Sequence, residues 1–251
     1  MKAWKIFTLS LKMIFGNLPQ VMKITLVPAL IGFAFLIGYM AILGISTSQL
    51  SGVESGSGAI GGGAAFGGFL LMLVLVMIAL WVIVAWHRFV LLAEYPTGWI
   101  PTVRFDRILS YAGHAILLGL LSFVIVLPVG LLMGVTASAA PVAGMVLMVL
   151  IILALNVIIF RLSPILPAAA IAKPLKMKEA WEATKGADGT ILLLLIILSG
   201  FQFVLQFALS LLVVIPVLGL LIMPVGLLIS ALINVSILTT LYGHFIEGRD
   251  L

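Results

Sequence analysis

The sequence has no cysteine among its 251 residues, which excludes disulfide bonds and thiolate metal sites. Charged residues are scarce as well: they make up 8% of the chain, whereas hydrophobic residues make up 64%. A soluble globular domain is about half apolar and about a quarter charged. Because a chain with so few polar side chains cannot cover a water-facing surface, we predict an integral membrane protein.

Enzyme signatures are also missing. The sequence contains no H-E-x-x-H, G-x-S-x-G or P-loop motif, and no pair of acidic residues lies within an apolar segment. The three histidines, His87, His114 and His244, are not grouped with acidic residues at metal-ligand spacing. These absences predict a protein that is not an enzyme and that holds no metal or cofactor.

Six apolar segments are long enough to cross a bilayer, which takes about 20 residues per helix. The predicted spans cover residues 21–44, 68–90, 110–135, 143–167, 190–214 and 225–246. They indicate an all-α polytopic membrane protein with a single integral membrane domain over residues 1–251. In sequence order the spans form three hairpins, 1–96, 97–176 and 177–251, which are candidates for internal repeats.

Residues 1–20 are predicted to lie in the membrane interface. Apolar side chains recur at helical spacing and most lysines fall elsewhere: Trp4, Phe7, Leu11, Ile14, Phe15 and Leu18 against Lys2, Lys5 and Lys12. This pattern is typical of an amphipathic helix at the headgroup level. Gly16, Asn17 and Pro19 then interrupt the helix. The alternative is a helix that continues into the first span.

Three connectors have distinct compositions. Residues 45–67 are rich in Gly and Ser and predict a flexible extramembrane loop. The run from Lys178 to Lys185 predicts a short helix, supported by Lys178 and Glu182 at i,i+4 and ended by Gly186. Pro216 and Pro224 predict a tight turn between spans five and six.

The basic residues predict the orientation. If the N-terminus is cytoplasmic, all 13 lysines and arginines lie on or near the cytoplasmic side, and the three opposite loops carry none. Cytoplasmic loops are enriched in Lys and Arg, so both termini are predicted to be cytoplasmic. The net charge of +5 then reflects topology and contact with anionic lipid headgroups rather than nucleic-acid binding.

Polar side chains within the spans are the first candidates for a functional role, because burying them in lipid is costly. Asn156 lies on span four, Gln202 and Gln206 on span five, and Asn234 on span six. One interpretation is a polar path for a solute between these spans. The other is helix packing, in which amides hydrogen-bond across helices.

His87, Arg88 and Arg161 lie near the cytoplasmic ends of their predicted spans. A guanidinium group suits a lipid phosphate, so these residues are candidates for headgroup contact. The alternatives are that they mark where the helix leaves the bilayer, or that Arg88 pairs with a carboxylate such as Glu94.

Three segments carry a resemblance to known proteins: Lys178-Glu-Ala-Trp181-Glu-Ala-Thr184-Lys-Gly186, Trp86-His87-Arg88-Phe89, and Arg161-Leu-Ser-Pro164-Ile-Leu-Pro167. They resemble uncharacterised six-span inner-membrane proteins of bacteria and, more broadly, the membrane domain attached to some glycerophosphodiester phosphodiesterases. The resemblance implies a bacterial inner-membrane location and the six-span layout. No phosphodiesterase catalytic domain is present in this chain, so that activity is not implied.

The leading functional prediction is a non-enzymatic scaffold, assembly or accessory factor for membrane complexes or lipids, with a membrane-protein partner or a second copy of itself. A small transporter or channel with a polar path between spans four to six is the alternative. An intramembrane lipid-modifying enzyme is a third hypothesis, for which the sequence offers no catalytic residues.

Overall fold

The computed structural model describes residues 1–43, 62–139, 141–213 and 216–251, and every regular element in these ranges is a helix. The helices are α1 (Lys2–Phe15), α2 (Leu18–Ile42), α4 (Gly62–Leu92), α5 (Phe105–Ala139), α6 (Pro141–Leu162), α7 (Ile165–Ala170), α8 (Met177–Ala183), α9 (Asp188–Val213) and α10 (Pro216–Phe245). The loop predicted at 45–67 falls mostly outside the described residues, and 62–67 belong to α4.

Within the described ranges, six helical segments are long and apolar enough to cross a membrane. They cover Leu18–Ile42, Gly62–Leu92, Phe105–Gly130, Val142–Ala170, Asp188–Leu212 and Pro224–Phe245. The prediction of an all-α, multi-pass membrane protein with six spans is therefore confirmed.

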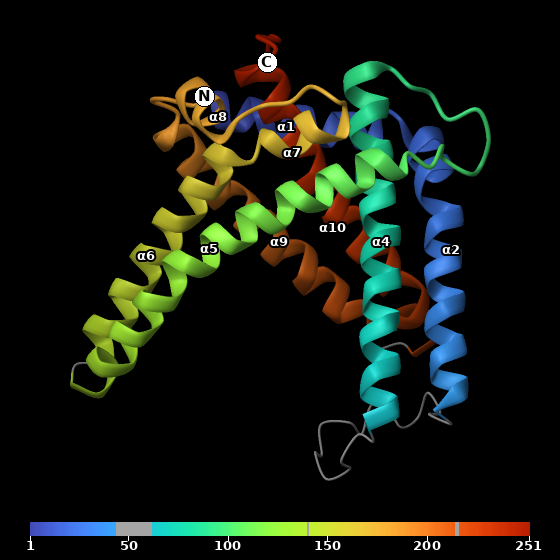
Figure 1. The fold of residues 1–251 in the computed structure, drawn as a ribbon, viewed down its shortest axis with the longest axis horizontal. Coiled ribbons are helices and arrows are strands. Elements are labelled where there is room, and N and C mark those ends of the chain that lie inside the picture. Colours follow the sequence, from blue (N-terminus) through green and yellow to red (C-terminus); the bar gives the residue numbers. More distant parts are fainter. Residues whose placement is uncertain (44–61, 140, 214–215) are drawn as a thin grey trace.

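Consecutive spans lie side by side: α2 with α4, α5 with α6, and α9 with α10 (Figure 1). Both chain termini, α1, α8 and the connectors at 93–104 and 171–187 lie at one end of the molecule, which we call the termini end. All 13 lysines and arginines are on segments at or next to this end. Away from it the pairs spread apart, and the α5/α6 pair leans away from the α2/α4 pair.

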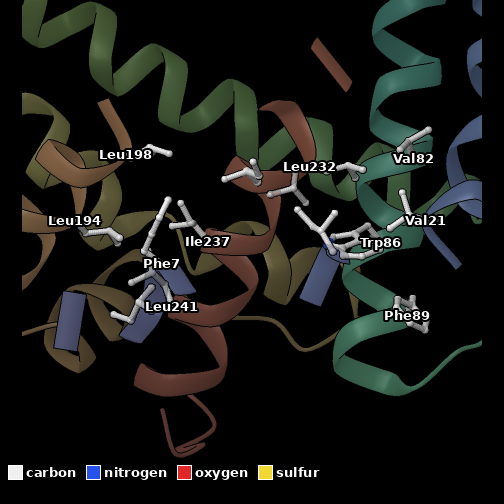
Figure 2. Close-up of a cluster of buried hydrophobic side chains, with 14 of the residues drawn as sticks. Phe7, Val21, Val82, Trp86, Phe89, Leu194, Leu198, Leu232, Ile237 and Leu241 are labelled. Atoms are coloured by element: carbon white, nitrogen blue, oxygen red, sulfur yellow. The ribbon is translucent and has the colours of Figure 1, made fainter. Parts of the chain in front are cut away.

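The buried core is concentrated near the termini end. Its largest cluster joins α1, α2, α4, α9 and α10, and Figure 2 shows Phe7, Leu194 and Leu241 meeting on one side of α10, with Trp86 on the other. Large apolar side chains farther along the spans are exposed, among them Val124 and Phe203. Helix packing therefore holds the pairs of spans together mainly at one end, and farther along many of their described apolar side chains face the surroundings of the chain.

The helix α1 docks on the spans through one face. Its buried residues are Ala3, Ile6, Phe7, Ser10 and Ile14. The rings of Phe7 and Phe201 of α9 meet edge to face, with centroids 5.4 Å apart. Trp4 and Phe15 remain 55% and 54% exposed. The apolar side chains of α1 are thus shared between the core and the surroundings, and its location at a membrane surface stays a prediction.

Prolines mark some of the helix boundaries but not all of those predicted. The predicted break after α1 is confirmed, and Pro19 lies in the first turn of α2, where a missing N–H is tolerated. Ser163-Pro164 separates α6 from α7 inside predicted span four. The predicted turn between Pro216 and Pro224 is wrong: Pro216 begins α10 and Pro224 lies inside it. Internal prolines are tolerated in membrane spans when neighbouring groups satisfy the freed backbone.

The α9/α10 pair stays in contact beyond the core. Gly226 of α10 is buried against Leu209 of α9, where an added Cβ would lie 2.5 Å from Leu209 Cδ1. The Ser230 hydroxyl of α10 donates a 2.7 Å hydrogen bond to Gln202 Oε1 of α9. Close backbone approach and an interhelical hydrogen bond are both typical of helix association in membranes.

Candidate functional site

Arg161, near the end of α6, binds the segment that contains α8 and the start of α9. Its side chain is 8% exposed. Nε donates to Thr184 Oγ1 at 3.3 Å, Nη1 to Asp188 Oδ1 at 3.0 Å, and Nη2 to the Trp181 carbonyl at 2.8 Å. The guanidinium carbon lies 3.5 Å from the centre of the Trp181 ring, an attractive cation–π geometry. We call these four residues the Arg161 clasp.

The local sequence shapes α8 for this contact. At its start, the Lys176 backbone N–H donates to Glu179 Oε2 at 3.0 Å, as in a capping box. At its end, the Thr184 hydroxyl donates to the Ala180 carbonyl at 2.9 Å, and Gly186 has a φ of +76°. A left-handed residue is common just after a helix, and glycine takes it without strain. The predicted short helix is confirmed, although it ends at Ala183 and Gly186 completes the turn that follows.

Arg88, near the end of α4, connects that helix to its neighbours. Its Nε donates to Glu94 Oε2 at 2.7 Å, and its Nη1 donates to the Ala170 carbonyl of α7 at 3.2 Å. The side chains of Arg88 and Glu94 are 13% and 30% exposed. Arg104 adds a weaker contact to the other Glu94 oxygen at 3.4 Å. The Arg88–Glu94 pair thus fastens the connector after α4 beside α7.

A buried polar seam joins α4, α10 and α1, and on the α1 side Ser10 Oγ lies 2.9 Å from Thr240 Oγ1. Trp86 Nε1 donates to Ser236 Oγ at 2.9 Å, and His87 Nδ1 lies 2.8 Å from Thr239 Oγ1. Because the Thr239 hydroxyl donates to the backbone of its own helix, Nδ1 of His87 is assigned as the protonated donor. His87 Nε2 is buried and has no hydrogen-bond partner in the described part of the chain. These bonds fix the rotation of α4 against α10.

The C-terminal tail is attached to the connector after α7. Lys173 Nζ donates to Glu247 Oε1 at 2.8 Å, and this bond raises the pKa of the exposed Lys173 side chain. Arg249 Nη2 donates to the Leu91 carbonyl of α4 at 3.1 Å. The tail therefore contacts two parts of the termini end. Within the described residues, no group of three or more His, Asp or Glu side chains could hold a metal ion.

The three residues predicted for lipid-headgroup contact are bonded to protein partners. His87 is fully buried, and the Arg88 and Arg161 side chains are 13% and 8% exposed. The alternative in which Arg88 pairs with Glu94 is confirmed. Contact of these side chains with a lipid phosphate stays a prediction, whereas their hydrogen bonds give each one a role in joining helices.

The four polar residues predicted for a solute path or for packing are not bonded to one another. Gln202 is half-buried and bonds across to Ser230, as the packing interpretation expects. Asn156 and Asn234 each donate, at 2.8 Å, to a carbonyl one turn earlier in the same helix. These two residues and Gln206 are exposed. Three of the four amides therefore face the surroundings of the chain.

Several partners in these contacts were not predicted from the sequence. Trp181 and Asp188 lie 20 and 27 positions from Arg161, and no sequence pattern links such residues. A signal did exist for the seam: Ser236, Thr239 and Thr240 are three and four positions apart, which places them on one face of a helix.

Comparisons with known proteins give no family assignment. No family model matches this chain, and neither does any curated protein or solved structure.

Proposed function

We propose that this chain is a non-enzymatic scaffold or accessory protein of the bacterial inner membrane, with both termini in the cytoplasm. The orientation is supported by the positive charge, since all 13 lysines and arginines lie on segments at or next to the termini end. The bacterial inner membrane is supported by the resemblance of the Lys178–Gly186 run, with its two companion segments, to six-span bacterial proteins.

The observation that carries the proposal is how the polar chemistry of the termini end is used. Arg161, Arg88 and His87 are bonded to other helices or connectors of the same chain. Catalytic or transported-ion chemistry requires polar groups that remain free to contact a substrate. Because these side chains bond within the chain, they join the helices and connectors of the termini end firmly to one another. Apolar spans with exposed side chains extend from this end.

The exposed amides support a membrane-protein partner or a homo-oligomer. Asn156, Gln206 and Asn234 lie on spans, where an amide facing lipid is unfavourable. A helix from a partner, or from a second copy, would satisfy these groups by interhelical hydrogen bonds. The same exposure favours the second candidate function, a small transporter or channel, because a water-lined path would also satisfy them.

Lipid contact is proposed for α1. Lys2, Lys5 and Lys12 are exposed, and Trp4 is exposed beside them. Exposed lysines attract anionic headgroups, and tryptophan favours the membrane interface. This arrangement supports binding of α1 to the anionic surface of the cytoplasmic leaflet.

Single-cysteine variants separate the two candidate functions, because the chain has no cysteine of its own. We would compare Gln206→Cys with Phe203→Cys, a matched control on the same helix that is also exposed but replaces an apolar side chain. Each variant would be reacted in native membranes with a water-soluble maleimide and with a short bifunctional cross-linker.

A scaffold predicts that Gln206→Cys cross-links to a defined protein or to a second copy and reacts slowly with the water-soluble maleimide. A transporter predicts fast maleimide labelling at position 206, slow labelling in Phe203→Cys, and flux of a polar solute in proteoliposomes that Gln206→Leu abolishes. Fast labelling together with such flux would refute the scaffold proposal.

A further inference from the structure

An apolar crevice of about 450 Å³ lies between α2, α4 and α10. Its floor is made of buried side chains and a buried glycine, including Gly32, Val82 and Leu232. Figure 2 shows Leu232 of α10 pointing towards Val82 of α4. Its rim includes Ala29 of α2 and Ala231 of α10, which are exposed. The crevice is therefore open on one side, towards the medium that surrounds the spans.

The crevice is as deep as one leaflet of a bilayer. Its lining runs from Thr25 to Leu36 on α2 and from Pro224 to Val235 on α10, a separation of 11 residues on each helix. Eleven helical steps correspond to about 16 Å. A hydrocarbon core about 30 Å thick gives each leaflet about 15 Å. Thr25 and Val235 mark the end of the crevice nearer the termini end, and Leu36 and Pro224 mark its far end.

Water does not suit this site. A buried water needs about two to four polar partners. Thr25 is the one residue of the lining with a polar side chain, and its hydroxyl already donates to the Val21 carbonyl at 2.7 Å. An empty crevice is also unfavourable, because its walls would lack partners for dispersion contacts. Hydrocarbon is available at the open rim throughout this depth.

The size of the crevice distinguishes between hydrocarbon occupants. A transmembrane helix with its side chains is about 10–12 Å across, so a volume of 450 Å³ would hold about one turn of it. A spanning helix therefore cannot enter. A single hydrocarbon chain is much narrower and can follow the full depth.

We propose that the crevice binds one acyl chain of a membrane phospholipid. The bound chain fills the space between the α2/α4 pair and α10 and contacts all three helices. The walls contact hydrocarbon, so the site selects a chain and not a headgroup. This site is independent of the scaffold proposal, since a transporter could hold the same lipid.

The test uses the full chain in proteoliposomes that contain phosphatidylcholine or phosphatidylglycerol with a photoactivatable diazirine in one acyl chain. After irradiation, adducts are mapped by peptide mass spectrometry. We expect several-fold more adducts on residues 25–36 and 224–235 than on residues 116–127 of α5, whose apolar side chains are also largely exposed. Both lipids should give the same pattern.

Filling the crevice provides the matched comparison. Ala231→Phe places a ring in the rim and should lower the adducts on 25–36 and 224–235 to the level of α5. Ala154→Phe makes the same change at an exposed alanine of α6, away from the crevice, and should leave the pattern unchanged. Ala29→Phe, from the opposite wall, should act like Ala231→Phe if that variant fails to fold.

Mass spectrometry of the unaltered protein released from detergent adds a measurement without substitutions, and one retained phospholipid of either headgroup is expected. Adducts spread evenly over all spans, or adducts that persist when the crevice is filled, would overturn the proposal. Protein–protein cross-links at the rim in place of lipid adducts would do the same, because they would assign the crevice to a partner.

Discussion

Replacing Arg161 with leucine is expected to release α8 from α6 while the spans stay folded. The change removes a hydrogen bond from a charged donor to the Trp181 carbonyl and another to the Thr184 hydroxyl. Such bonds contribute about 1.5–3 kcal/mol each, and the 3.3 Å bond to Thr184 is at the weak end. Asp188 is 56% exposed, so solvent screening leaves that ion pair below about 1 kcal/mol. The expected loss is about 3 kcal/mol in total.

Hydrogen exchange measured by mass spectrometry on the chain in lipid nanodiscs detects this loss directly. A change of about 3 kcal/mol raises the opening equilibrium of α8 on the order of 100-fold, so its amides should exchange correspondingly faster in Arg161→Leu. Arg161→Lys should fall in between, because it keeps the charge but loses the planar fork and the stacking on Trp181. Lys178→Ala is the matched control, since its 4.0 Å pair with Glu182 is exposed on both sides and contributes little.

Two results would refute this reasoning. Exchange in residues 177–186 that is equal in Arg161→Leu and the unaltered chain would mean that the Arg161 clasp does not hold α8. Faster exchange throughout α2 and α4 would mean that Arg161 supports the whole bundle and not one connector.

Three further predictions concern other contacts. In a double-mutant cycle, Arg88→Ala and Glu94→Ala should show a coupling energy of about 1–2 kcal/mol in detergent unfolding experiments, because the pair is mostly shielded from solvent; additive effects would contradict this. The raised pKa of Lys173 stabilises the fold fully below the ordinary lysine pKa of about 10.4, and this stabilisation disappears as pH rises through the higher native pKa. The free energy of unfolding should therefore fall less steeply above about pH 10 in Lys173→Met than in the unaltered chain, and equal slopes would count against the ion pair. Gly226→Leu should destabilise the α9/α10 contact by about 1–3 kcal/mol in the same unfolding assay, because a buried leucine of α9 occupies that space. Gly38→Leu, where an added Cβ meets nothing within 4 Å, should have a much smaller effect, and equal losses would show that packing is not the cause.

The sequence predicted the features of the fold that depend on local physics. Apolar runs of sufficient length identify the six spans, and Pro19 and Gly186 mark boundaries because their backbone restrictions act locally. The turn predicted from Pro216 and Pro224 is wrong for the same reason. A proline in sequence disfavours a helix, but tertiary contacts around a membrane span can satisfy the freed carbonyls, and this context is not visible locally.

In the candidate site, too, a contact between residues close in sequence could be predicted and contacts between distant residues could not. Glu94 is a visible candidate partner for Arg88 in the sequence, because only six positions separate them. The bonds from Arg161 to Trp181 and from His87 to Thr239 join residues 20 and 152 positions apart. They depend on how the pairs of spans pack together, which hydropathy does not specify. From the sequence, Arg161 and His87 are candidates for lipid contact. The structure shows both side chains hydrogen-bonded to other parts of the chain.

The spreading of the three pairs has a mechanical consequence. The helix α5 has 35 residues and is about 52 Å long, and α4 has 31 residues and is about 46 Å long. A hydrocarbon core is about 30 Å thick, so helices of this length must tilt or extend beyond it. Few buried side chains oppose such tilting far from the termini end. Bilayer thickness therefore acts on both pairs far from their common support, and the resulting torque falls on the junction where α5, α7 and α4 meet.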